Sequence, residues 1–200
     1  MVTELHAERL RKVVEVLCDC GARTVLDLGC GQGELMLLFA AEPRFTSIVG
    51  IDPSPRALDQ ARTRLALAGH QTGTGRLSLF RGSATRFSED CTGFDAIALV
   101  EVIEHIPPGR LSSLEKTVFT GYRPPICVMT TPNSEYNVLH GMPEGARRHR
   151  DHQFEWPRAR FESWAKGIAR RHNYKVRFSA LGEIDPRHGS STQMALLLRL

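Results

Sequence analysis

The sequence has few of the features that place a protein in a membrane or outside the cell. None of its apolar runs approaches the roughly 18 to 20 residues that a membrane span requires. Its first residues carry charges where a signal peptide would have an apolar segment. Its five cysteines are an odd number and show no zinc-ligand spacing, so we expect free thiols. These absences predict a soluble, cytoplasmic protein with no membrane partner.

The composition is that of an ordinary globular protein. Of the 200 residues, 42% are hydrophobic and 24% are charged, which argues against disorder. The length suits one domain with a full core and is short for two. We therefore expect a single, monomeric domain, and its formal net charge of +4 mildly favours an anionic partner.

The apolar spacing predicts strands that alternate with helices. The predicted strands are residues 24–29, 47–52, 77–80, 94–102, 126–131, 174–181 and 193–200. The predicted helices are residues 4–18, 34–41, 54–68 and 157–172, with a further helix that opens at Pro107 and contains Leu111, Leu114 and Val118. Thr3 is the expected cap of the first helix. This alternation predicts an open α/β sheet with helices on both faces.

A glycine-rich turn connects the first predicted strand to its helix. It reads Asp27-Leu28-Gly29-Cys30-Gly31-Gln32-Gly33, and glycine there lets the backbone approach a ligand closely. Glu34 stands where a dinucleotide fingerprint has its third glycine, which favours a smaller nucleoside ligand. Asp52 ends the second strand, where a carboxylate can accept both hydroxyls of a ribose. A tight turn without a ligand and a solvated Asp52 are the alternatives.

Together with Gly82-Ser83-Ala84 after the third strand, these residues resemble the S-adenosylmethionine-dependent methyltransferases of the Rossmann-like class. The resemblance covers residues 24–131. It implies a mostly parallel seven-stranded sheet with an antiparallel C-terminal strand, and S-adenosylmethionine as cofactor. It also implies the cofactor-binding residues: Asp27, Gly29 and Gly31 at the methionine end, Asp52 at the ribose, and Ser83 and Ala84 at the base.

Two carboxylates and an imidazole follow the fourth predicted strand, in Glu101-Val102-Ile103-Glu104-His105. If residues 101–105 form one helical turn, Glu101, Glu104 and His105 share a face. A buried pair of glutamates needs a counter-charge, so we expect a divalent cation at this end of the sheet. Solvated glutamates and a His105 that caps a helix are the alternative.

Residues 133–156 read as a long loop, and loops of this length are usually functional. The motifs Glu101-x-x-Glu104-His105, Thr130-Thr131-Pro132-Asn133 and Arg150-Asp151-His152-x-Phe154-Glu155-Trp156 resemble the bacterial form of the Hua enhancer family of RNA 3′-terminal 2′-O-methyltransferases. The resemblance implies Mn²⁺ or Mg²⁺ bound by four catalytic residues: Glu101, Glu104, His105 and His152. From the residues alone, His149 competes with His152 as the fourth ligand.

The reaction implied by the resemblance is metal-dependent methyl transfer to the 2′-hydroxyl of the 3′-terminal nucleotide of RNA, in repair or end protection. A cation that chelates the 2′ and 3′ hydroxyls would lower the pKa of the 2′-hydroxyl. Such chelation would reject DNA and internal nucleotides. An O-methyltransferase of a small diol and an RNA-end binding module without activity are the alternatives.

The loop also carries the expected RNA contacts, which are Arg147, Arg148, His149 and Arg150, with Arg158 and Arg160 as further candidates. A solvated basic loop is the alternative. We expect Phe154 and Trp156 to pack this loop onto the core; stacking on an RNA base is the alternative.

The predicted organisation divides the chain into a leading helix (1–22), a cofactor-binding core (24–132), a substrate and metal loop (133–156), and a closing helix with two strands (157–200). The resemblance further implies an RNA end-healing and ligating enzyme as a partner.

Overall fold

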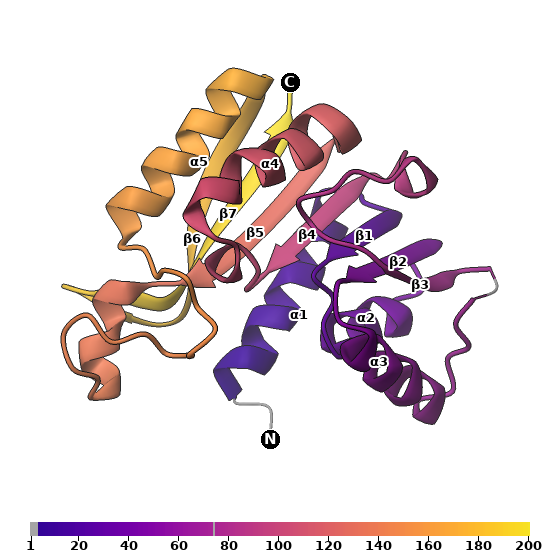
Figure 1. Cartoon of the computed structure of the whole chain (residues 1–200), viewed down its shortest axis with the longest axis horizontal. Coiled ribbons are helices and arrows are strands. Elements are labelled where there is room, and N and C mark those ends of the chain that lie inside the picture. Colours follow the sequence, from indigo (N-terminus) through magenta and orange to yellow (C-terminus); the bar gives the residue numbers. More distant parts are fainter. Residues whose placement is uncertain (1–3, 74) are drawn as a thin grey trace.

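The computed structural model describes residues 4–73 and 75–200. Its strands are β1 (Thr24–Leu28), β2 (Ser47–Asp52), β3 (Leu77–Arg81), β4 (Ala96–Val100), β5 (Ile126–Pro132), β6 (Tyr174–Asp185) and β7 (Gly189–Arg199). They form one sheet in the order β3-β2-β1-β4-β5-β7-β6 (Figure 1). β7 pairs antiparallel with β5 and β6, and the other described strand pairs are parallel. The predicted mostly parallel, seven-stranded sheet is confirmed.

Helices cover both faces of the sheet, as predicted. They are α1 (Glu4–Asp19), α2 (Glu34–Ala41), α3 (Pro55–Leu67), α4 (Leu111–Glu115) and α5 (Arg158–His172). Because side chains alternate along a strand, neighbouring residues such as Val25 and Leu26 enter different cores. One core packs against α1, α2 and α3, and the other packs against α4 and α5 (Figure 1).

Several elements differ from their predicted extent. β6 and β7 are longer than expected and meet in a hairpin at residues 185–189, so the predicted break between 181 and 193 is wrong. β4 is shorter than expected at both ends, because the backbone N–H of Asp95 donates to Oγ1 of Thr24 instead of a strand carbonyl, and Glu101 has a left-handed φ of 55°. The helix expected after Pro107 starts as a 3₁₀ turn and continues past α4 as a π-helical segment, Lys116–Tyr122. Thr3 lies outside the described residues.

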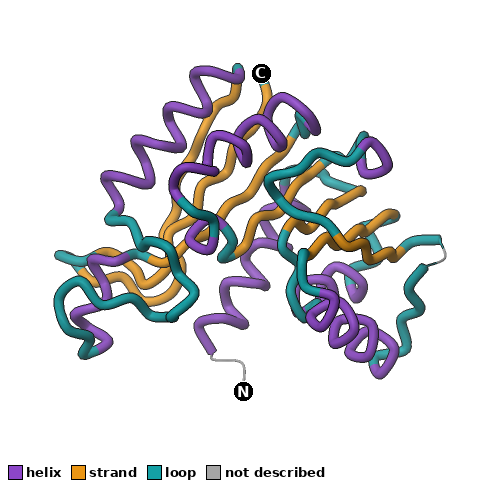
Figure 2. The backbone as a smooth tube through the Cα atoms, viewed as in Figure 1, coloured by secondary structure: helices purple, strands orange, loops and turns teal. Residues whose placement is uncertain are grey.

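The segment 133–156 is a loop with one 3₁₀ segment, Ser134–His140, whose first N–H groups are capped by the Asn133 side chain. Its two ends meet in a parallel bridge between Asn133 and Trp156. Figure 2 shows it as an arch beside the β6–β7 hairpin. In the described part of the chain, no helix has the length and apolar character needed to cross a bilayer.

Candidate active site

A cavity of about 520 Å³ opens at the carboxyl ends of β1, β2, β3 and β4. Residues from all four following loops line it: Gly29, Gly31, Asp52, Ser83, Ala84, Thr85, Glu101, His105 and Arg110. Five of the six predicted cofactor residues therefore lie around one space. The exception, Asp27, is buried in β1.

The backbone after β1 has the conformation that its glycines permit. Gly29 has a φ of 87°, and a Cβ there would lie 2.6 Å from Cγ2 of Val102. Gly31 has a φ of 52°, with no atom within 4 Å of its added Cβ, so open space lies beside it. Its N–H donates to Oδ2 of Asp52 at 2.9 Å, and the N–H of Ser54 donates to Oδ1 at 2.8 Å. Asp52 is thus fixed in the cavity wall with further lone pairs available for ribose hydroxyls.

Asp27 is a buried carboxylate with an unused acceptor. Its Oδ2 is fully enclosed and has no hydrogen-bond partner. Burial, reinforced by the charge of Asp52, raises the pKa of Asp27 to about 7. Such a group is suited to a cationic ligand, because an ammonium donates the missing hydrogen bond and supplies the counter-charge.

A second group of polar residues lies beside this cavity. The potential ligand atoms of Glu104, His105 and His152 lie within 4.8 Å of one another. Glu104 and His105 belong to a 3₁₀ turn, Ile103–His105, directly after β4, whereas His152 comes from the loop. The structure thus brings together three of the four predicted metal ligands from positions 47 residues apart in sequence.

Glu101 is placed differently from the prediction. It has a left-handed φ of 55°, and the turn starts only at Ile103, so the expected single helical turn through 101–105 is wrong. Its Oε1 accepts from Oγ1 of Thr130 at 3.0 Å, and its Oε2 lies 3.3 Å from Nη1 of Arg9. The carboxylate therefore faces α1 rather than the Glu104 group.

The residues present fit a divalent cation. Oε2 of the fully buried Glu104 accepts from Oγ1 of Thr131 at 3.0 Å, while its Oε1 is enclosed without a partner. Burial and the charge of Glu101 raise the pKa of Glu104 well above its usual range. Burial and the neighbouring ring of His152 lower the pKa of His105, which favours the neutral imidazole that binds metals. One cation would satisfy both the unpaired oxygen and the unfavourable charge.

His149, the competing candidate for the fourth ligand, lies further from His105 than His152 does. The rings of His105 and His152 have centroids 4.8 Å apart, whereas the ring of His149 lies 6.3 Å from that of His105. His149 is 56% exposed in its side chain, and its Nδ1 lies 3.6 Å from a carboxylate oxygen of Asp151. The geometry therefore favours His152 as the ligand.

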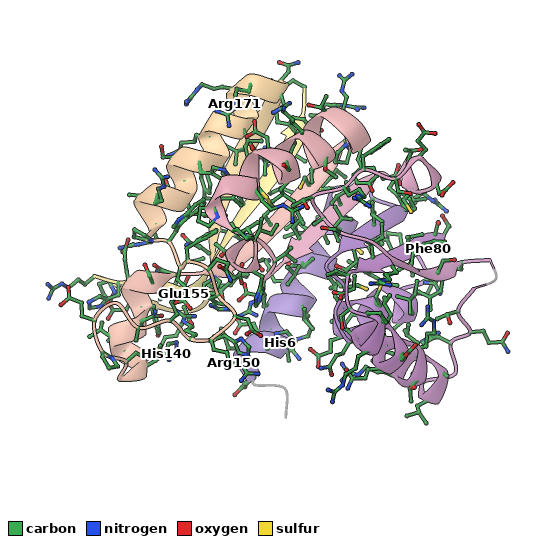
Figure 3. All side chains as sticks on the ribbon, viewed as in Figure 1. His6, Phe80, His140, Arg150, Glu155 and Arg171 are labelled. Carbon is green, nitrogen blue, oxygen red and sulfur yellow. The ribbon has the colours of Figure 1, made fainter. Side chains whose placement is uncertain are left out.

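The basic loop residues separate into two kinds. Arg150 extends into solvent with 92% of its side chain exposed (Figure 3). Arg147 is exposed as well, although its guanidinium donates to the carbonyl of His152. Arg148 points inward and donates to Asn137, Asn133 and Ser191. The prediction that Arg148 contacts RNA is therefore corrected, because its guanidinium is occupied by the protein.

The aromatic residues of the loop pack as expected. The rings of Phe154 and Trp156 are stacked with centroids 4.3 Å apart, and Trp156 meets Trp164 of α5 edge to face at 5.4 Å. Arg158 and Arg160, the further candidates for RNA contacts, are both engaged within the protein: Arg158 pairs with Glu135, and the guanidinium of Arg160 lies over the ring of Trp156. These contacts fasten the loop to the core that faces α5.

Sequence reasoning missed Arg9, which is buried on α1. Its guanidinium reaches Glu101, and its Nη2 donates to Oγ1 of Thr192 on β7 at 2.9 Å. Since these partners lie 92 and 183 residues away, no local pattern could reveal the contact. The sequence does contain one signal: Arg9 lies next to Leu10, at the start of the apolar face of α1, where a charged residue indicates a buried ion pair.

The sheet is open and mostly parallel, its β7 is antiparallel, and a cavity lies at the carboxyl ends of the parallel strands. This combination is typical of the S-adenosylmethionine-dependent methyltransferases. The profile of the methyltransferase domain family matches residues 25–124. The methyltransferase domain of bacterial CtHen1 is 40% identical and superimposes with a TM-score of 0.87, over 98% of this chain and 99% of that one. The chain belongs to this family of Hen1 methyltransferase domains.

Longer relatives share the same region. A small RNA 2′-O-methyltransferase of Mus musculus is 32% identical over 183 residues, which are 89% of this chain and 46% of that protein. A protein of the same name from Arabidopsis thaliana is 29% identical and is covered over 22% of its length. The chain thus spans at most about half the length of these curated relatives.

Proposed function

We propose that this chain transfers the methyl group of S-adenosylmethionine to the 2′-hydroxyl of the 3′-terminal nucleotide of RNA, with a divalent cation. The observation that carries the proposal is that the cofactor cavity and the metal-ligand group share a wall, since His105 belongs to both. The relatives in mouse and Arabidopsis thaliana are named small RNA 2′-O-methyltransferases, which supports RNA as the substrate and its 2′-oxygen as the acceptor.

In this proposal each part of the site has one task. Asp52 accepts the ribose hydroxyls of the cofactor, and Asp27 accepts its ammonium group. The S–CH₃ bond breaks as the O–CH₃ bond forms, the proton of the attacking hydroxyl passes to solvent water, and S-adenosylhomocysteine remains. Glu104, His105 and His152 would hold the ion, with Glu101 as a fourth ligand after its carboxylate turns from Arg9. The ion, Mn²⁺ or Mg²⁺, supplies the charge that lowers the pKa of a hydroxyl.

The RNA would approach between the loop and α1. Arg150, Arg147 and His149 are exposed on the loop and can contact phosphates, which makes binding dependent on salt. A role in RNA repair or end protection, and an end-healing and ligating enzyme as partner, are part of the proposal. The cytoplasmic location and the monomeric state stay predictions.

The test is transfer of labelled methyl from S-adenosylmethionine to RNA oligonucleotides with defined 3′ ends. We expect labelling of a 2′,3′-diol end with Mn²⁺, and loss of labelling with EDTA, with a 2′-deoxy end or with a 3′-deoxy end. His152→Ala should lose activity at least a hundredfold, whereas the neighbouring His149→Ala should retain most of it. Equal activity of His152→Ala would refute this ligand set, and full labelling of a 3′-deoxy end would refute chelation of both hydroxyls.

The same assay separates the two other functions. An enzyme acting on a small diol would label a catechol and ignore RNA. A binding module would retard RNA in a gel without labelling it. Either result contradicts the proposal.

A further inference from the structure

We infer that Glu155 is a positioning residue that fixes the ring of His152, and that Asn137 and Arg148 hold Glu155 in turn. The inference rests on the metal site of the proposed function and assigns a task to residues that do not touch the ion. Oε1 of Glu155 lies 2.6 Å from Nδ1 of His152, and both side chains are buried.

The contacts of Glu155 favour an ionised carboxylate. Its Oε1 accepts from the backbone N–H of Arg148 at 2.7 Å, and its Oε2 accepts from Nδ2 of Asn137 at 2.7 Å. Each oxygen thus already faces a donor that cannot reverse its role, so Glu155 acts as an acceptor toward the third neighbour, Nδ1 of His152.

An acceptor at this place determines the tautomer of His152. Nδ1 must carry the ring proton in order to donate to Glu155, which leaves the lone pair on Nε2. Nε2 is then the nitrogen available to the group formed with Glu104 and His105. Carboxylates that hold the second nitrogen of a metal-binding histidine commonly orient the ring and raise its basicity.

The carboxylate is itself anchored to the sheet. Nε of Arg148 donates to Oδ1 of Asn137 at 2.6 Å, so that amide is held on both sides. The guanidinium also donates to the carbonyl of Asn133 at 2.7 Å and to the carbonyl of Ser191, on β7, at 2.9 Å. These hydrogen bonds connect the loop segment that carries His152 to Asn133 and to β7.

The alternative is that Glu155 only shapes the loop. The variant Glu155→Gln distinguishes the two, because it keeps the volume and one acceptor oxygen. If the amide N–H of glutamine faces Nδ1 of His152, Nδ1 becomes the acceptor and the ring proton moves to Nε2. A purely structural role predicts no such change of tautomer.

The experiment measures Mn²⁺ affinity from the free-ion electron paramagnetic resonance signal, and the histidine tautomer from ¹⁵N chemical shifts. We expect Glu155→Gln to weaken Mn²⁺ binding at least tenfold. The control Glu135→Gln removes a carboxylate of the same loop, which pairs with Arg158 and not with a histidine. It should bind Mn²⁺ as the wild type does. Unchanged binding of S-adenosylhomocysteine shows that each variant is folded.

The wild-type protein alone also tests the inference, so the test remains possible if a variant fails to fold. His152 in the metal-free wild type must show its proton on Nδ1; a proton on Nε2 overturns the inference. Mn²⁺ affinity of Glu155→Gln within twofold of the wild type overturns it as well. If the wild type binds no Mn²⁺, the metal site of the proposed function fails instead, and the two failures are thus distinguishable.

Discussion

Asp27 is a carboxylate whose ionisation the fold opposes and a cofactor would restore. Burial first, and the charge of Asp52 second, raise its pKa to about 7, so the protein without ligand retains the proton in mildly acidic solution. A cationic amine requires the carboxylate form. Binding of the cofactor should therefore release a proton wherever Asp27 is still protonated.

The first prediction concerns the pH dependence of this binding. Affinity for S-adenosylhomocysteine should rise about tenfold per pH unit below pH 7 and level off above it, because one pKa unit is worth roughly 1.4 kcal/mol. Calorimetry at pH 6 in two buffers of different ionisation enthalpy should show proton release. Asp27→Asn should bind weakly and without this dependence. A dissociation constant that is constant between pH 5.5 and 7 would contradict the assignment.

The second prediction compares two glycines of the same turn. The alanine of Gly29→Ala would have a positive φ, and its Cβ would lie 2.6 Å from Cγ2 of Val102. The substitution should therefore lower the free energy of unfolding by about 2 kcal/mol or more. Gly31→Ala meets only the positive φ and should cost about 1 kcal/mol. Its methyl group would occupy the open side of the turn and should weaken binding of S-adenosylhomocysteine. Urea denaturation and titration separate the two effects; equal stability losses would contradict the steric argument.

At the scale of elements, periodicity predicted what local sequence determines. α2 and β2 have the predicted bounds, because both are dense apolar runs and α2 lies between Gly33 and Pro43. The extension of β6 carries the exposed Glu183 and Ile184, and that of β7 carries the small or polar but buried residues 189–192. Neither extension alternates apolar with polar residues, so the strand ends were not predicted. The left-handed Glu101 and the inward turn of Arg148 depend on contacts across the fold, which no window of sequence contains.

The third prediction concerns the two arginines on either side of His149. Arg148→Ala removes four hydrogen bonds of one guanidinium and should destabilise the protein by about 2 to 3 kcal/mol, with faster proteolysis within 133–156. Arg150→Ala should leave stability unchanged. If the proposed RNA contact exists, it should lower RNA affinity and reduce the salt slope by about one. Equal stability of the two variants would refute the difference in their roles.

At the scale of the whole molecule, the cofactor cavity and the metal-ligand group lie at one edge of a sheet that joins two cores. A ligand bound at this edge contacts the sheet that both cores share and therefore stabilises the folded state of the whole domain. The fourth prediction is that S-adenosylhomocysteine at a hundred times its dissociation constant adds about 2.7 kcal/mol to the free energy of unfolding. Mn²⁺ should also raise the melting temperature of the wild type, and should not do so for His152→Ala. Calorimetric scans check both effects, and an equal rise in the variant would place the ion elsewhere.

The bridge between Asn133 and Trp156 brings both ends of the long loop to one point. Because β5 and α5 are joined there, residues can be gained or lost around the middle of the arch without altering the register of a single strand. The exposed middle of the arch can therefore vary between relatives, while Arg148 keeps its hydrogen bonds to Asn133 and Ser191. Chimaeras that exchange only residues 141–145, most of which are exposed, should retain the thermal stability of the recipient.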